Sequence, residues 1–185
     1  DLITILGVGM SVKYEGRSKT LELTANIGNQ TFARNTDFNN ITQDIAINFK
    51  NEFSEYDRMS LTNVFTHTDL PIFSREDFFQ EQQGRTQGSF DYFKNRFHVN
   101  YSRDVFKQVS VTFKYDNNID AFSGLDLEAS LLNRIGVESK YSITPDTAFL
   151  FLYDFANRKF EEGSAASINT VTTGIKQYIT RKIYF

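Results

Sequence analysis

The sequence predicts an all-β protein, an antiparallel up-and-down transmembrane β-barrel, of which this chain supplies about nine to ten strands. Three observations predict it. Apolar and polar residues alternate with a period of two through most of the 185 residues, as in strands with two unlike faces. The alternating stretches are about twice the usual strand length of about 5–6 residues, which suits a tilted bilayer crossing. Short and long connections also alternate along the chain.

The N-terminal half shows the alternation most clearly. Over 2–15 the even positions are mostly apolar, and the odd positions from Gly7 onward are small or charged. In the stretches 18–33 and 39–53 most odd positions are apolar, chiefly 21–27 and 45–49, and most even positions are polar. A fourth strand is expected over 57–70. Each of these stretches therefore has one face for an apolar phase and one for water.

The C-terminal half repeats this pattern, and we expect further strands over 86–103, 107–120, 125–143, 147–160 and 166–180. Odd positions from Val109 to Tyr115 are apolar and the even positions beside them are polar. In the strand over 147–160, Leu150 and Leu152 make the polar face more apolar than elsewhere. The prediction is thus nine complete strands and the beginning of a tenth near the C-terminal end.

The expected connections fall into two classes. Short turns are predicted at 16–17, 53–57, 101–104, 141–146 and 178–182, and the last four share an aromatic residue, a small or β-branched residue and then a charge. Longer and more variable connections are predicted at 34–38, 71–85, 121–124 and 161–165. Short turns at one rim and long loops at the other are typical of outer-membrane barrels, whose short turns are periplasmic.

Composition excludes several classes of function. The formal net charge is −3 and there is no Cys, so disulfides, thiolate chemistry and Cys-based metal sites are excluded, and scattered basic residues give no case for nucleic acid. Mean hydropathy is −0.40, and no run of about 18 apolar residues exists that could form a transmembrane helix. A barrel strand tolerates this polarity because only half of its residues contact lipid. We expect no cofactor.

The predicted inward-facing set is charged with both signs. In a wide barrel these residues would line a hydrated lumen, and in a narrow one they would pair across the interior and fill it, because isolated buried charge is costly. The candidates for the lumen are Lys13, Glu22, Asp44, Lys50, Arg58, Lys114, Asp116, Glu128, Arg134, Glu138, Lys140, Asp154, Arg158 and Lys176.

The predicted outward-facing set is aliphatic and aromatic. Several of its aromatic residues lie beside the short turns, where an interfacial girdle is expected. The candidates for contact with lipid are Val8, Val12, Leu23, Ile47, Phe49, Val111, Phe113, Val137, Tyr141, Phe149, Phe151 and Tyr153. The alternative is the core of a soluble β-sandwich, in which these side chains pack against a second sheet.

Three segments resemble a known family. They are Asp1-Leu2-Ile3-Thr4 continuing into the stretch 9–18, the stretch 30–40, and Tyr141-Ser142-Ile143-Thr144-Pro145-Asp146. They are similar to hairpins of the β-barrel porin type 2 family, whose members are large outer-membrane barrels associated with exopolysaccharide synthesis and export. The resemblance implies a bacterial outer-membrane location, a polar solute or polysaccharide as cargo, other envelope export proteins as partners, and no active site.

We interpret residues 1–185 as a single barrel domain that is a segment of a longer barrel. The first strand runs toward a short turn, whereas a whole barrel of this class begins on the side of the short turns. The terminal Phe185 resembles the assembly signal at the end of many barrels. However, Arg181 and Lys182 lie where a closing strand should have an apolar residue at every second position. The resemblance implies that the segment is the N-terminal half.

Other candidate chemistry is weak. His67 and His98 are the only histidines in the sequence. His98 has the inward parity of Asn100 and Ser102, but neighbours two apart on a strand are too far apart for a relay without further partners, and His67 points the other way, so no catalytic set is expected. The stretch 116–120 superficially resembles a calcium loop but lacks its turn glycine and bidentate glutamate, so no metal site is predicted. The connection over 71–85 is either a plain surface loop or a constriction. Two alternatives to a channel stay open, a non-conducting anchor barrel and a soluble secreted β-protein.

Overall fold

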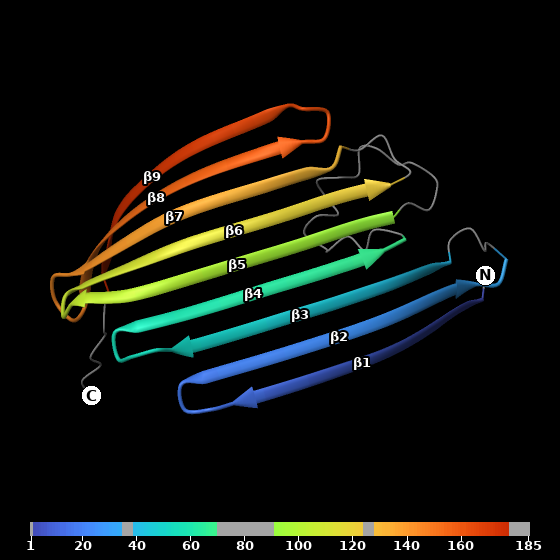
Figure 1. The fold of residues 1–185 in the computed structure, drawn as a ribbon, viewed down its shortest axis with the longest axis horizontal. Coiled ribbons are helices and arrows are strands. Elements are labelled where there is room, and N and C mark those ends of the chain that lie inside the picture. The colour runs from blue at the N-terminus through green and yellow to red at the C-terminus, as the bar shows by residue number, and fades with distance from the viewer. Residues whose placement is uncertain (1, 35–38, 70–90, 124–127, 178–185) are drawn as a thin grey trace, which may run out of the picture.

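The computed structural model describes residues 2–34, 39–69, 91–123 and 128–177. These residues form one nine-stranded antiparallel sheet in which the strands follow one another in chain order. Figure 1 shows them as a single curved layer. The strands are β1 (Ile3–Glu15), β2 (Lys19–Phe32), β3 (Asn40–Glu52), β4 (Asp57–Thr68), β5 (Asp91–Phe106), β6 (Val109–Ser123), β7 (Ser130–Ser142), β8 (Thr147–Phe160) and β9 (Ala165–Gln177). The predicted all-β, up-and-down class is confirmed.

The strands are long and their pairing is nearly continuous. They run from 12 residues in β4 to 16 in β5. One register shift interrupts the pairing of β5 with β6, between Asp104 and Phe106. In the part of the chain that the structure describes, no helix is long and apolar enough to cross a membrane.

One predicted turn is wrong. Residues 101–104 lie inside β5, and the chain turns instead at Lys107 and Gln108. The aromatic-then-charged pattern at this point belongs to a strand, because Arg103 pairs with Asp57 on β4 and Asp104 pairs with Ser110 on β6. Pairing across the sheet therefore extends β5 beyond the position that the local pattern suggested.

The other connections need fewer changes. Turns at 16–18, 53–56, 143–146 and 161–164 lie close to their predicted places, whereas β6 continues to Ser123 through most of the connection predicted at 121–124. The predictions for 71–85 and 178–182, the tenth strand, the terminal Phe185 and most of 34–38 fall outside the described residues. Below, the edge carrying the turns 16–18, 53–56, 107–108 and 143–146 is the short-turn rim, and the opposite edge is the long-connection rim.

The sheet has no second layer over either face among the described residues. Ala148 is the one buried hydrophobic residue there, while Val8, Phe113 and Phe151 remain 79%, 52% and 38% exposed. A β-sandwich would bury such side chains against a facing sheet. The alternative of a soluble β-sandwich is therefore wrong, because the large apolar side chains pack on nothing in the described chain.

The two edge strands of the described sheet run in the same direction. Among the described strands, β1 pairs only with β2, and β9 pairs only with β8. β1 ends at the turn 16–18, and β9 begins after the turn 161–164, so both run from the long-connection rim to the short-turn rim. Joining the two edges directly would produce a parallel pair in an otherwise antiparallel sheet.

Candidate functional site

The register gives the sheet two chemically distinct faces. Partners in an antiparallel ladder point to the same face, as do alternate residues of one strand. Following the pairs from Lys13 leads to Glu22 on β2 and, further along the same row, to Asp116 and Arg134 on β6 and β7. We call the face that carries these residues the polar face and the opposite one the apolar face.

The predicted lumen residues that lie in strands all share the polar face. Glu128 precedes β7 and is exposed at the long-connection rim. The remaining members belong to one face by register and parity: Lys13, Glu22, Asp44, Lys50, Arg58, Lys114, Asp116, Arg134, Glu138, Lys140, Asp154, Arg158 and Lys176. Whether this face borders a lumen stays a prediction.

The predicted lipid-facing residues all lie on the apolar face. By register and parity these are Val8, Val12, Leu23, Ile47, Phe49, Val111, Phe113, Val137, Tyr141, Phe149, Phe151 and Tyr153. In the described strands, acidic and basic side chains occur on this face only near strand ends, at Lys19, Asp57, His67, Asp91, Arg103 and Lys159. The span between the rims is uncharged, which is what hydrocarbon requires.

Ion pairs on the polar face join neighbouring strands. Arg58 Nη2 lies 2.6 Å from Asp104 Oδ2, and Arg96 Nη2 lies 2.7 Å from Asp120 Oδ1. His98 pairs with Asp116, and Lys114 pairs with Glu138. The side chains of these four pairs are 18–49% exposed, so the pairs are partly hydrated and each contributes little stability. Their main effect is to hold charges at fixed places on the polar face.

Other cations on this face have no such neighbour. Arg134, Lys140 and Arg158 make no ion pair with any residue that the structure describes. Arg134 lies opposite Asp116 in the register, but that carboxylate is bound to His98. β7 and β8 therefore present positive charge that is available to a solute or to water.

Glycines leave hollows on the polar face. A hollow of about 350 Å³ is lined by residues including Gly7, Gly9, Gly28, Asn26 and Asp44. A Cβ atom at Gly9 would collide with the side-chain oxygen of Asn26. Small residues here thus make room for polar side chains of the neighbouring strand.

Gly136 plays the same part further along the sheet. A Cβ atom at Gly136 would collide with the Asp154 carboxylate and would lie 3.6 Å from the Cβ of Lys114. The Asp154 side chain therefore lies over the backbone of β7, close to the Lys114 side chain.

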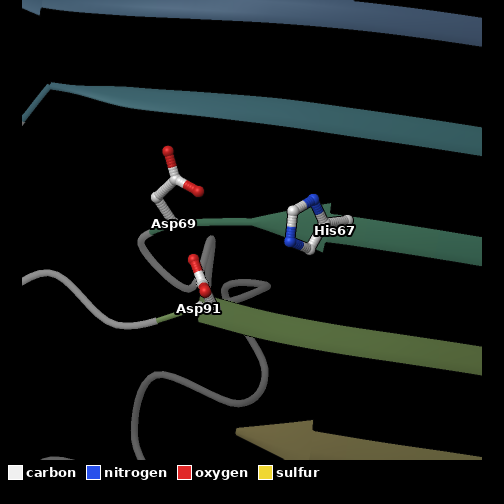
Figure 2. A group of neighbouring side chains, drawn as sticks. All are labelled: His67, Asp69 and Asp91. Carbon is white, nitrogen blue, oxygen red and sulfur yellow. The ribbon is translucent and has the colours of Figure 1, made fainter. Parts of the chain in front are cut away.

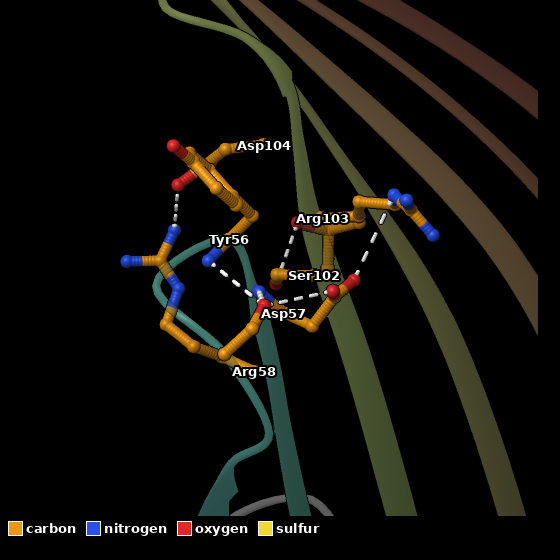
Figure 3. Close-up of polar contacts among 8 residues, drawn as sticks. Tyr56, Asp57, Arg58, Ser102, Arg103 and Asp104 are labelled. Atoms are coloured by element: carbon orange, nitrogen blue, oxygen red, sulfur yellow. Dashed lines mark hydrogen bonds and ion pairs between the residues drawn. The ribbon is translucent and has the colours of Figure 1, made fainter.

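A cluster of polar contacts ties β4 to β5 at the short-turn rim, as Figure 3 shows. Tyr101 Oη donates a 2.6 Å hydrogen bond to Asp57 Oδ1, and Arg103 Nε lies 3.7 Å from the same oxygen. On the other face, Arg58 binds Asp104, whose backbone N–H donates to the carbonyl of Tyr56 at 2.9 Å. This cluster places a tyrosine hydroxyl and charges where the apolar face ends, as an interfacial girdle requires.

An acidic group lies at the opposite rim. Desolvation raises the pKa of Glu128, and a hydrogen bond with Glu162 and the negative charges of Glu162 and Glu161 raise it further. These residues belong to two different connections, 124–129 and 161–164, so the strand order brings them together.

Two weak candidates from the sequence are now placed. His98 and His67 lie on opposite faces as predicted, and His98 makes its pair with Asp116 rather than with Ser102, whose hydroxyl lies 2.9 Å from that of Thr112. The stretch 116–120 lies within β6, where its side chains alternate between faces and cannot converge as a calcium loop does.

Sequence reasoning missed part of the polar face on β5. Arg96 binds Asp120, which also accepts a 3.3 Å hydrogen bond from Tyr92 Oη. Arg96 has the parity of His98, which the sequence did place on the inward face, and that signal could have found it.

Comparison with known proteins supports the fold. No protein-family model matches the sequence, and no curated protein matches it. Among solved structures, the outer membrane channel DcaP of Acinetobacter baumannii matches with a TM-score of 0.69 at 11% identity, over 95% of this chain and 52% of that chain. The chain has the fold of an outer-membrane β-barrel. The match covers 52% of the DcaP chain, so this chain spans about half the length of that protein.

LpxR from Salmonella typhimurium matches over 91% of this chain and 76% of that chain, with 7% identity and a TM-score of 0.34. That TM-score is too low to support an argument. The fold match to DcaP supports the predicted outer-membrane location. The resemblance to the β-barrel porin type 2 family and the absence of catalytic activity stay predictions.

Proposed function

We propose that this chain forms part of the wall of an outer-membrane channel, with its polar face toward a hydrated lumen and its apolar face toward lipid. The observation that carries the proposal is the separation of charge. The polar face carries ion pairs and unpaired cations along the strands, while the apolar face is uncharged between its two rims. A lumen accommodates the first surface and hydrocarbon the second.

The barrel needs further strands to close. Because β1 and β9 run in the same direction, a fully antiparallel closure requires an odd number of additional strands between them. Bacterial barrels of one chain have even strand numbers, which agrees with this count. The match to about half of the DcaP chain, 52%, also favours a complete barrel considerably wider than nine strands. A lumen of that width stays hydrated rather than filled by side chains.

The cargo we propose is a polar solute or an exopolysaccharide. The polar face offers hydroxyl and amide groups such as Thr62, Asn48 and Asn100 beside charges of both signs, and these are suited to hydrogen bonding with a hydrated polymer. The polysaccharide assignment, and partnership with other envelope export proteins, rest on the family resemblance. No bond is made or broken in this function.

Planar bilayer recordings of the full-length protein test the proposal. Arg134→Glu exchanges an unpaired cation for an anion on the polar face, so we expect the reversal potential in a salt gradient to shift toward cation selectivity. The matched control is Lys19→Glu, which makes the same charge change on the apolar face at the start of β2 and should leave selectivity unchanged.

Two outcomes would count against a channel. Equal shifts from both substitutions would mean that the polar face does not line the conducting path. A correctly folded protein that produces no channel openings would favour the second candidate function, a non-conducting anchor whose interior is filled by its own ion pairs.

A further inference from the structure

A mixed nitrogen and oxygen ligand set lies at the long-connection rim, outside the polar face. His67 is the penultimate residue of β4, Asp69 follows the end of that strand, and Asp91 is the first residue of β5. One ligand atom from each residue can be chosen so that all three lie within 4.8 Å of one another. Figure 2 shows Asp69 and Asp91 at the adjoining ends of the two strands, with His67 on β4 two residues before Asp69.

The register explains why these three side chains converge. His67 pairs with Phe93 and Thr68 with Tyr92, so the same register continued by one step sets Asp69 opposite Asp91. His67 and Asp69 are two residues apart at the end of β4, so their side chains share a face of the sheet. Asp91 lies opposite Asp69, so its side chain points to the same face. The cluster is thus a consequence of the pairing of β4 with β5.

The electrostatics of the cluster favour a cation. Two carboxylates in directly opposed positions repel each other. One oxygen of Asp69 accepts a 3.2 Å hydrogen bond from the backbone N–H of Ile41, which orients that carboxylate and leaves its other oxygen available. The side chains of His67 and Asp91 make no hydrogen bond or ion pair with any other residue that the structure describes. No described cation therefore offsets the two negative charges.

We propose that His67, Asp69 and Asp91 form a binding site for one divalent cation of the zinc class. One imidazole nitrogen and two carboxylate oxygens are three of the four ligands that Zn²⁺ takes, with water in the fourth position. The imidazole argues against Mg²⁺ and Ca²⁺, which take oxygen ligands. Because the ligands come from both ends of the connection between β4 and β5, the bound ion would fix those ends together.

The test is Zn²⁺ binding to the full-length protein in detergent, measured by isothermal titration calorimetry after chelator treatment. We expect one Zn²⁺ per chain at this site, with affinity reduced at least about tenfold in His67→Gln and in Asp91→Asn. The matched control is His98→Gln, which removes the other histidine of residues 1–185 and should leave Zn²⁺ affinity at this site unchanged.

Titration of the histidine side-chain NMR signals gives a second measurement on the same samples. The signal that disappears in His67→Gln identifies His67, and the signal that disappears in His98→Gln identifies His98. The His67 signal should shift on addition of Zn²⁺, whereas the His98 signal should not. Weakening by Asp91→Asn alone, with His67→Gln unchanged, would mean diffuse attraction to the acidic pair and would overturn the proposed site. Absence of Zn²⁺ binding in the folded protein would also overturn it.

Discussion

The assignment of the two faces can be tested by introducing one charged residue on each face of the same strand, in two separate variants. Phe151→Arg puts a guanidinium on the apolar face of β8, where the side chain is 38% exposed and the neighbouring residues in the register are Ser139 and Thr173. Leu152→Arg puts the same group on the polar face one residue later, directly opposite Glu138.

The depth of Phe151 sets the expected magnitude. It lies four residues after Thr147, the first residue of β8. At about 3.3 Å per residue and a tilt of about 35–45°, it is about 10 Å above the end of the strand. An apolar band about 25 Å tall that begins at the strand end has its middle close to that height. Arginine near the midplane costs about 2–4 kcal/mol, so we expect a loss of about 3 kcal/mol.

The control should behave differently because of its surroundings. At position 152 a guanidinium can reach water and the Glu138 carboxylate, so we expect a change within about 1 kcal/mol. Both variants would be measured by equilibrium denaturant unfolding of the full-length protein folded into phospholipid vesicles. Equal losses of stability in the two variants, or a larger loss in Leu152→Arg, would refute the assignment of the faces.

Three further predictions concern packing and charge. Gly136→Val makes the Asp154 carboxylate turn aside, and because that group is the flexible end of its side chain we expect the unfolding free energy to fall by only about 1 kcal/mol in the same assay. Asp57→Ala removes the acceptor of the tyrosine and serine hydroxyls at the short-turn rim and should cost about 1–2 kcal/mol, with faster hydrogen exchange at the ends of β4 and β5. Folding raises the pKa of Glu128 above its ordinary value of 4.5, so the ionised form of Glu128 is disfavoured in the folded state. The resulting loss of folding stability is absent below pH 4.5 and grows as pH rises through the folded pKa. Glu128→Gln should therefore raise the thermal midpoint near neutral pH and not below pH 4.5, and a pH-independent effect would contradict the repulsion from Glu162.

The sequence alone determined the fold class and the division of residues between the two faces. Alternation is a local property, since a strand sends successive side chains to opposite sides whatever it pairs with. Val137 and Glu138 could therefore be assigned to opposite faces before any pairing was known, and the register placed them there. The uncharged span of the apolar face follows from the same alternation.

Only the tertiary structure decided where strands end and which charges meet. The turn at Lys107 and Gln108 depends on the pairing of β5 with β6, which continues to Phe106 and Val109, so the local pattern around Arg103 was misleading. Similarly, Asp69 and Asp91 are 22 positions apart in the sequence, and the β4–β5 register sets them side by side. Register is set jointly by two strands and the connection between them, so neither strand by itself specifies it.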